Sequence, residues 1–112
     1  MQHQMKLTSV PFEKIRNGSK VIESRLYDEK RQTINLDDEI LFSQSDNDGQ
    51  TVNTKVIGIL HYSSFQQLFV DHDPKLFGGA SADELLKEIK QFYSDEDEAK
   101  YGVVGVRLEK ID

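Results

Sequence analysis

Apolar side chains change their spacing along this chain, and the changes divide it into helical and extended segments. Phe12 and Ile15, three positions apart, predict the apolar face of a helix over residues 10–17. Pro11 suits the first turn of that helix, and Ser9 is its expected cap.

The same spacing predicts two further helices, over residues 64–71 and 81–93. Their apolar faces consist of Phe65, Leu68 and Phe69 in the first and of Leu85, Ile89 and Phe92 in the second. Each begins with a serine followed three residues later by Gln or Glu, which is the pattern of a capping box. Ser94 is expected to cap a short acidic turn, residues 95–98, whose carboxylates form a solvated helix start.

The segments between the helices are typical of short strands. Extended segments are predicted at residues 5–7, 18–27, 39–43, 51–62 and 103–111. Gly58 marks a bulge in the longest of them, and the run Ser45–Gly49 predicts a hairpin turn before it. The order of a helix, several strands, a helical insertion and a closing strand predicts an α+β fold built on a mixed β-barrel.

The strand at residues 18–27 carries charged side chains in a regular pattern. Glu23, Arg25 and Tyr27 share one face with Val21, while Ile22, Ser24 and Leu26 share the other, which is the expected core side. Lys20 breaks this parity and joins the charged face only if the strand begins with a twist or a bulge. The structural alternative is an exposed sheet face whose Glu–Arg pair contributes roughly 0–1 kcal/mol.

Gly18, Lys20, Glu23 and Arg25 form the pattern G-x-K-x-x-E-x-R after a short helix. This pattern resembles the signature of the ASCH domain, the module named for homology to activating signal cointegrator-1. The segments 28–31 and 101–105 resemble a small prokaryotic single-domain branch of that family, and the resemblance runs from about Met5 to Ile111. It implies a PUA-like mixed β-barrel with flanking helices, and a signature beside a cleft between barrel and helices.

Where the family usually has glycine in a turn, this chain has Asp37. Aspartate tolerates a positive φ better than most residues, so we expect the turn to survive the change.

The charged stretch suits RNA or another nucleotide-like or nucleoside ligand. The arginine presents a planar fork to a phosphate or a base edge, and the lysine adds a point charge. A tyrosine on the same face could stack on a base, although a ring that only covers the sheet is the favoured alternative. The expected ligand-binding residues are Lys20, Glu23, Arg25, Tyr27, Lys30 and Arg31. Six of the fourteen Lys and Arg residues fall within residues 14–31, so this part of the chain is expected to be positive.

Two alternatives remain open at this point. One branch that the chain resembles hydrolyses acetylated cytidine with a lysine, a threonine and a glutamate. The lysine matches Lys20, but Glu23 stands at the threonine position and the glutamate falls near Gly78. Lys20 and Glu23 are therefore the candidate catalytic residues of a small amidohydrolase, and a non-catalytic interaction domain is the remaining alternative.

Composition narrows the remaining classes of function. The chain has 112 residues, which predicts a single domain over residues 1–112. Its net charge of −6 argues against broad phosphate binding, and the absence of cysteine excludes disulfides and thiolate metal sites. We expect no metal, since His61, Asp71, His72 and Asp73 lack a ligand spacing, and no cofactor. No apolar run approaches a membrane span and no secretory signal is evident, so the expected location is the cytoplasm.

Overall fold

The computed structural model describes residues 1–111, apart from the side chains of residues 47 and 48. Five strands and four α-helices alternate with two 3-10 turns, η1 and η2. In chain order they are β1 (Gln2–Leu7), α1 (Ser9–Arg16), β2 (Ile22–Leu26), η1 (Arg31–Thr33), β3 (Glu39–Gln44), β4 (Asn47–Tyr62), α2 (Phe65–Asp71), η2 (Pro74–Phe77), α3 (Ala82–Ile89), α4 (Asp95–Tyr101) and β5 (Val103–Lys110). The predicted α+β class is confirmed.

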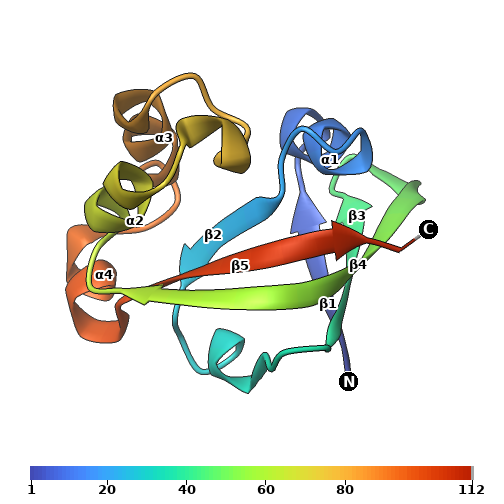
Figure 1. Cartoon of the computed structure of the whole chain (residues 1–112), viewed down its shortest axis with the longest axis horizontal. Coiled ribbons are helices and arrows are strands. Elements are labelled where there is room, and N and C mark those ends of the chain that lie inside the picture. Colours follow the sequence, from blue (N-terminus) through green and yellow to red (C-terminus); the bar gives the residue numbers. More distant parts are fainter. Residues whose placement is uncertain (112) are drawn as a thin grey trace.

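The five strands form one curled sheet in the order β1-β3-β4-β5-β2. β1 pairs with β3 in parallel, and the other three pairs are antiparallel. Strands β1 and β2 are the two edges; β1 runs beneath α1, and β2 runs from beside α1 toward α4 (Figure 1). The predicted mixed barrel is thus a half-barrel that is open between β1 and β2.

Two groups of buried apolar side chains hold the molecule together. The first group fills the space between the curled sheet and α1. The second group packs β2 and β5 against α2, α3 and η2. The first consists of Met5, Leu7, Phe12, Ile15, Ile34, Ile40, Phe42, Val52, Val56, Val104, Val106 and Leu108. The second consists of Ile22, Leu26, Phe65, Leu68, Phe69, Phe77, Leu85 and Val103. In Figure 1, α2, α3 and α4 lie together on one side of the sheet and α1 lies apart from them.

The helices agree with the sequence pattern except at their ends. Ser9 is the first residue of α1, and its N-cap is Thr8, whose side chain makes no capping bond. Helix α3 ends at Ile89 instead of residue 93. Phe92 therefore leaves the predicted apolar face and is 70% exposed, because the chain has already turned away from the helix axis. Ser64 and Ser81 cap α2 and α3 as predicted, each accepting a hydrogen bond from the N–H three residues later. The side chain of Glu84 accepts from the N–H of Ala80, one residue before the N-cap, so this half of the predicted capping box differs.

The strands differ from the prediction mainly in where they begin. β2 begins at Ile22, so residues 18–21 connect it to α1 instead of belonging to the strand. β4 begins at residue 47, which moves the hairpin turn back to Ser45 and Asp46. The predicted irregularity at Gly58 is present as a register shift between β4 and β5. Asp37 has a φ of 72°, as the turn requires.

Glu98 contradicts the prediction of a wholly solvated acidic turn. It is buried in the first turn of α4, where its carboxylate accepts a hydrogen bond of 2.7 Å from the backbone N–H of Phe65. Lys90 pairs with the same carboxylate at 2.6 Å. Glu98 thus satisfies an N-terminal donor of α2 and ties α4 to that helix. Within residues 1–111, no helix is long and apolar enough to cross a membrane.

We expect Phe12→Ala to destabilise the protein by about 2–5 kcal/mol, because its ring is fully buried beneath α1 and removal leaves a cavity. Val10→Ala on the same helix is the matched control. Val10 is 62% exposed, so its truncation should change the free energy of unfolding by no more than about 0.5 kcal/mol. Urea unfolding curves measure both, and equal losses would contradict the assignment of Phe12 to the core.

Candidate functional site

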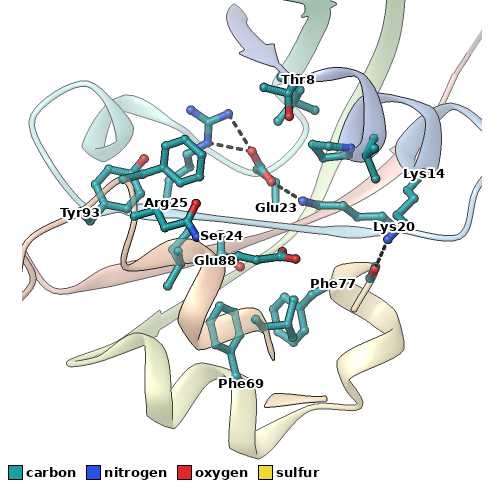
Figure 2. Close-up of a pocket in the computed structure, with 18 of the residues that line it drawn as sticks. Thr8, Lys14, Lys20, Glu23, Ser24, Arg25, Phe69, Phe77, Glu88 and Tyr93 are labelled. Carbon is teal, nitrogen blue, oxygen red and sulfur yellow. Dashed lines mark hydrogen bonds and ion pairs between the residues drawn. The ribbon is translucent and has the colours of Figure 1, made fainter. Parts of the chain in front are cut away.

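The main pocket of the molecule lies at the free edge of β2. It has a volume of about 710 Å³ and is bounded by β2, the junction of β1 and α1, the end of η2, and α3 with the residues after it. Figure 2 shows Lys20, Glu23 and Arg25 together along one wall, with Phe69 and Phe77 on another side. The pocket exists because neither α1 nor α3 covers this edge of the sheet.

Lys20 reaches the pocket from the connection between α1 and β2. Gly18 has a φ of +85°, a left-handed conformation that ends α1 and reverses the chain. The backbone N–H of Lys20 then donates to the carbonyl of Lys14 at 2.9 Å, and that of Val21 donates to the carbonyl of Leu76 at 2.9 Å. These two bonds fix Lys20 beside the strand, so the predicted meeting with Glu23 occurs from a loop and requires no bulge.

Glu23 is the centre of a buried ionic cluster. One carboxylate oxygen lies 2.8 Å from Nζ of Lys20, and the other accepts from Arg25 at 2.8 Å from Nε and 2.7 Å from Nη2. The exposed fractions of the three side chains are only 13%, 5% and 14% in chain order. The ion pair between Glu23 and Arg25 is therefore buried, and the alternative of an exposed surface pair is wrong.

The two cations determine the charge state of Glu23. Burial raises the pKa of this carboxyl, but the charges and hydrogen bonds of Lys20 and Arg25 outweigh burial and lower it from 4.5 to about 2. Burial also lowers the pKa of Arg25, while Glu23 and the Tyr93 hydroxyl raise it above its ordinary value. Glu23 is thus a carboxylate at neutral pH and a fixed anchor for both cations.

Arg25 also connects the two edges of the sheet. Its Nη2 donates to the backbone carbonyl of Lys6 in β1 at 3.2 Å. No strand pairs with β1 on this side, because β1 ends the sheet. A side chain of β2 therefore satisfies a carbonyl of the opposite edge strand, and the guanidinium lies at the opening of the half-barrel.

The backbone of Ser24 adds a donor and an acceptor to the pocket. Val21 accepts from Leu108 of β5, and Tyr27 donates to the carbonyl of Gly102 just before β5. In an antiparallel pair, residues that hydrogen-bond to the neighbouring strand alternate with residues whose N–H and C=O point away from it. Ser24 is one of the outward residues, and it lines the pocket.

Several lining residues were not among the expected site residues. Phe92 is the clearest, since an apolar residue at helical spacing is ordinarily core, whereas here its ring is exposed at the pocket. Tyr93 lies beside Arg25, and Glu88 of α3 faces the same space (Figure 2). Thr8 lines it from the start of α1. Phe92 is exposed because α3 ends before it. The apolar pattern does not show where α3 ends, so no signal in the sequence pointed to Phe92.

The other expected site residues lie elsewhere. Tyr27 is absent from the pocket lining, and its ring packs on His61 with 4.3 Å between centroids. Lys30 and Arg31 line a second, smaller pocket, which also contains Arg25. Tyr27 therefore covers the sheet, with its ring against His61 of β4, in agreement with the favoured alternative. Within residues 1–111, no group of three or more His, Asp or Glu side chains is placed to hold a metal ion.

Gly78 lies beside Lys20. Its φ of +82° places it in the left-handed region, and its carbonyl accepts a hydrogen bond of 2.6 Å from Lys14. A Cβ here would lie 3.1 Å from Lys14 and 3.2 Å from Lys20. The position matched to a glutamate in the hydrolytic branch is thus close to Lys20, but it carries no carboxylate and has little room for one.

Comparison with known proteins agrees with this fold. The model of the ASCH domain family matches residues 5–112. The chain is similar to the crystal structure of hypothetical protein PH0355, with 40% identity and a TM-score of 0.88, covering 99% of this chain and 100% of that one. It is also similar to the solution structure of protein PF0455 from Pyrococcus furiosus, with 32% identity, a TM-score of 0.78, and coverage of 100% and 99%.

A more distant similarity shows the fold alone. The crystal structure of ASCH from Zymomonas mobilis has 13% identity and a TM-score of 0.61, over 96% of this chain and 66% of that one. No curated protein matches the chain. The PUA-like architecture predicted from the signature is confirmed.

We expect Glu23→Gln to lower the free energy of unfolding at pH 7 by about 2–4 kcal/mol, because two buried cations lose their counterion. The folded-state pKa of Glu23 is depressed, so its stabilisation is complete above about pH 4.5 and is lost as the pH falls toward about 2. The stability difference between the wild type and the variant should shrink over that interval. Urea unfolding at several pH values measures it.

Glu88→Gln is the matched control, since Glu88 is an exposed carboxylate of the same pocket and its substitution should change stability by no more than about 0.5 kcal/mol. A Glu23→Gln deficit that stays constant from pH 7 to the acid limit of folding would contradict the ionic role of Glu23.

Proposed function

The chain belongs to the ASCH domain family, a PUA-like family of RNA-binding-type modules, and from this premise we propose that its main pocket binds one nucleobase of a single-stranded RNA or of a nucleotide. The observation that carries the proposal is the ionic cluster at the wall of the pocket. Glu23 holds Lys20 and Arg25 there as fixed hydrogen-bond donors.

The cluster suits a ligand that presents acceptors. Glu23 already receives hydrogen bonds from both cations, so its role is to position them. An ammonium has three donors and a guanidinium five, and each cation uses only some of them within the cluster. Carbonyl oxygens at the edge of a base are acceptors of the right kind, and guanine and the pyrimidines carry them. The backbone of Ser24 would add one donor and one acceptor to this edge.

The apolar residues of the pocket suit the faces of the same base. Val10 on one side and Phe92 on the other expose large apolar surfaces at the pocket, while Phe77 and Leu85 lie deeper. An exposed ring that touches a cleft offers a base a stacking surface. Polar groups at one edge and apolar surfaces beside them are the usual composition of a small-ligand site.

Local charge supports an anionic ligand in spite of the acidic chain. The net charge of the protein is −6. The main pocket nevertheless has four cationic side chains, Lys6, Lys14, Lys20 and Arg25, and only two carboxylates, Glu23 and Glu88. The excess is positive but small, which favours a nucleotide or a short single strand over a long duplex.

The alternatives have less support. For hydrolysis of an acetylated nucleoside, Lys20 is engaged by Glu23 at 2.8 Å, and Gly78 offers no carboxylate. A general base or nucleophile needs a group that is free to take a proton or attack. For a simple interaction domain, a buried ion triad at a deep pocket would be unnecessary, because surface pairs serve solubility without desolvation.

Binding should depend on both cations. In titrations with short single-stranded RNA and with mononucleotides, Lys20→Ala and Arg25→Ala should each reduce affinity by about 10- to 100-fold, the value of one or two charge-assisted hydrogen bonds. Lys87→Ala, an exposed lysine of α3 that is absent from the pocket lining, is the control. Guanine and pyrimidine nucleotides should bind more tightly than adenine nucleotides, which lack a carbonyl oxygen on the base.

Wild-type affinity in both cation variants would overturn the proposal. Equal affinity for nucleotides of all four bases would mean that the pocket recognises only the charge of the ligand, and it would refute base recognition. Binding should weaken with salt, with a small slope because few basic residues converge on the site.

Phe92→Ala should weaken binding of the same ligands by roughly 5- to 150-fold if the ring stacks on a base. Because Phe92 is 70% exposed, the substitution should leave the melting temperature nearly unchanged. Phe92→Tyr should retain affinity, since it keeps a stacking surface. Unchanged affinity in Phe92→Ala would remove the ring from the proposed site.

A further inference from the structure

We propose that the second pocket is a phosphate subsite of the same binding site, so that the ligand is a phosphorylated nucleotide or an RNA strand whose phosphate lies next to the bound base. This inference rests on the proposed function of the main pocket and extends it. The second pocket has a volume of about 390 Å³ and lies at the opening between the edge strands β1 and β2.

The lining of this pocket is strongly cationic. It consists of Gln4, Met5, Lys6, Arg25, Lys30, Arg31 and Ser43. Four of these seven side chains carry positive charge, and none is a carboxylate. The protein as a whole has a net charge of −6 and repels anions, but this local set of cations attracts an anion to the pocket. Arginine forks, lysine ammonium groups and a serine hydroxyl are the donors that bind phosphate oxygens.

The two pockets adjoin each other. Lys6 and Arg25 line both of them, and a hydrogen bond of 3.2 Å joins Nη2 of Arg25 to the Lys6 carbonyl between them. One ligand could therefore contact both pockets if a base and a phosphate are as close as they are within one nucleotide. Arg25 would face the base on one side and the phosphate on the other.

Arg31 lines the second pocket, and part of its hydrogen-bonding capacity is unused. Its Nη1 donates to Asp28 at 2.9 Å, and its backbone N–H donates to the same carboxylate at 3.2 Å, which fixes the start of η1. Its buried Nε has no hydrogen-bond partner among the described residues. A buried donor without an acceptor is costly, and such groups commonly mark a place that an ion or water completes.

Asp28 neutralises part of the Arg31 charge, and Glu23 neutralises part of the Arg25 charge. The remaining attraction therefore comes largely from Lys6 and Lys30. Lys30 is exposed and has no ion-pair partner among the described residues. It can therefore move onto a phosphate without breaking an existing contact. The same chemistry serves the monoester of a nucleotide and the diester of an RNA strand, and these two sources have to be separated by experiment.

The test compares ligands that differ only in phosphate. Isothermal titrations would use guanosine, its 5′- and 3′-monophosphates, a guanosine-containing dinucleotide with one phosphodiester, and inorganic phosphate. We expect at least one phosphorylated ligand to bind the wild type about 10- to 100-fold more tightly than the nucleoside. Preference for a monophosphate would identify a nucleotide as the ligand, and preference for the dinucleotide would identify an RNA strand.

Two variants assign that gain to the second pocket. Lys30→Ala changes an exposed side chain and should fold normally, and Arg31→Gln keeps hydrogen-bonding capacity without charge. Each should reduce the gain from phosphate severalfold while leaving nucleoside affinity unchanged, and Lys87→Ala should change neither. Competition by inorganic phosphate against the phosphorylated ligand alone would support the subsite.

The outcomes separate the two proposals. If guanosine binds through Lys20 and Arg25 but phosphate adds nothing, or if the gain persists in both Lys30→Ala and Arg31→Gln, the phosphate subsite is wrong and the base pocket stands. If neither guanosine nor any phosphorylated ligand binds, the proposed function itself fails.

Discussion

The carboxylate of Glu23 is the interaction on which the candidate site depends. A carboxylate with 5% side-chain exposure is costly to bury, and here Lys20 and Arg25 offset that cost by direct contact on both oxygens. Each cation in turn is held in place by the carboxylate. Removing Glu23 would leave both cations desolvated and without this ionic partner, whereas removing either cation would leave the carboxylate with the other one, so the three charges are coupled through Glu23.

The same unit explains why the sheet stays open where the pocket forms. Strands β1 and β2 are the edges of the sheet, and the Arg25 side chain satisfies the Lys6 carbonyl at that opening. Lys20 is positioned from the other direction, by backbone bonds to α1 and to η2. The sheet, α1 and the helical segment from α2 to α3 therefore meet at one ion cluster. The pocket is the space between them. A closed barrel would have exchanged these side-chain contacts for backbone pairs.

Positive and negative side chains occupy different parts of this protein. Acidic residues give the chain its net charge of −6, yet the two adjoining pockets at the sheet opening are lined mainly by cations. The buried carboxylate of Glu98 has its own partners, the backbone N–H of Phe65 and the ammonium of Lys90. This separation limits non-specific attraction of nucleic acid and confines favourable potential to a small area. It is consistent with a site that recognises one nucleotide unit at a time.

Local sequence determined the elements, and tertiary structure determined what they surround. Apolar spacing and capping residues were sufficient to place each helix and strand in the chain but not to fix all of their ends, and strand alternation put Glu23 and Arg25 on one face, since alternation and capping act over a few residues. Four features could not be obtained in this way. Lys20 meets Glu23 through a loop fixed by Lys14 and Leu76, which lie in different elements. Phe92 is exposed because α3 ends early, while Tyr27 is kept out of the pocket because its ring packs on His61 of β4. The depth of the ion cluster depends on how α1, η2 and α3 pack around the edge of β2. Those are contacts between distant parts of the chain, and only the folded chain specifies them.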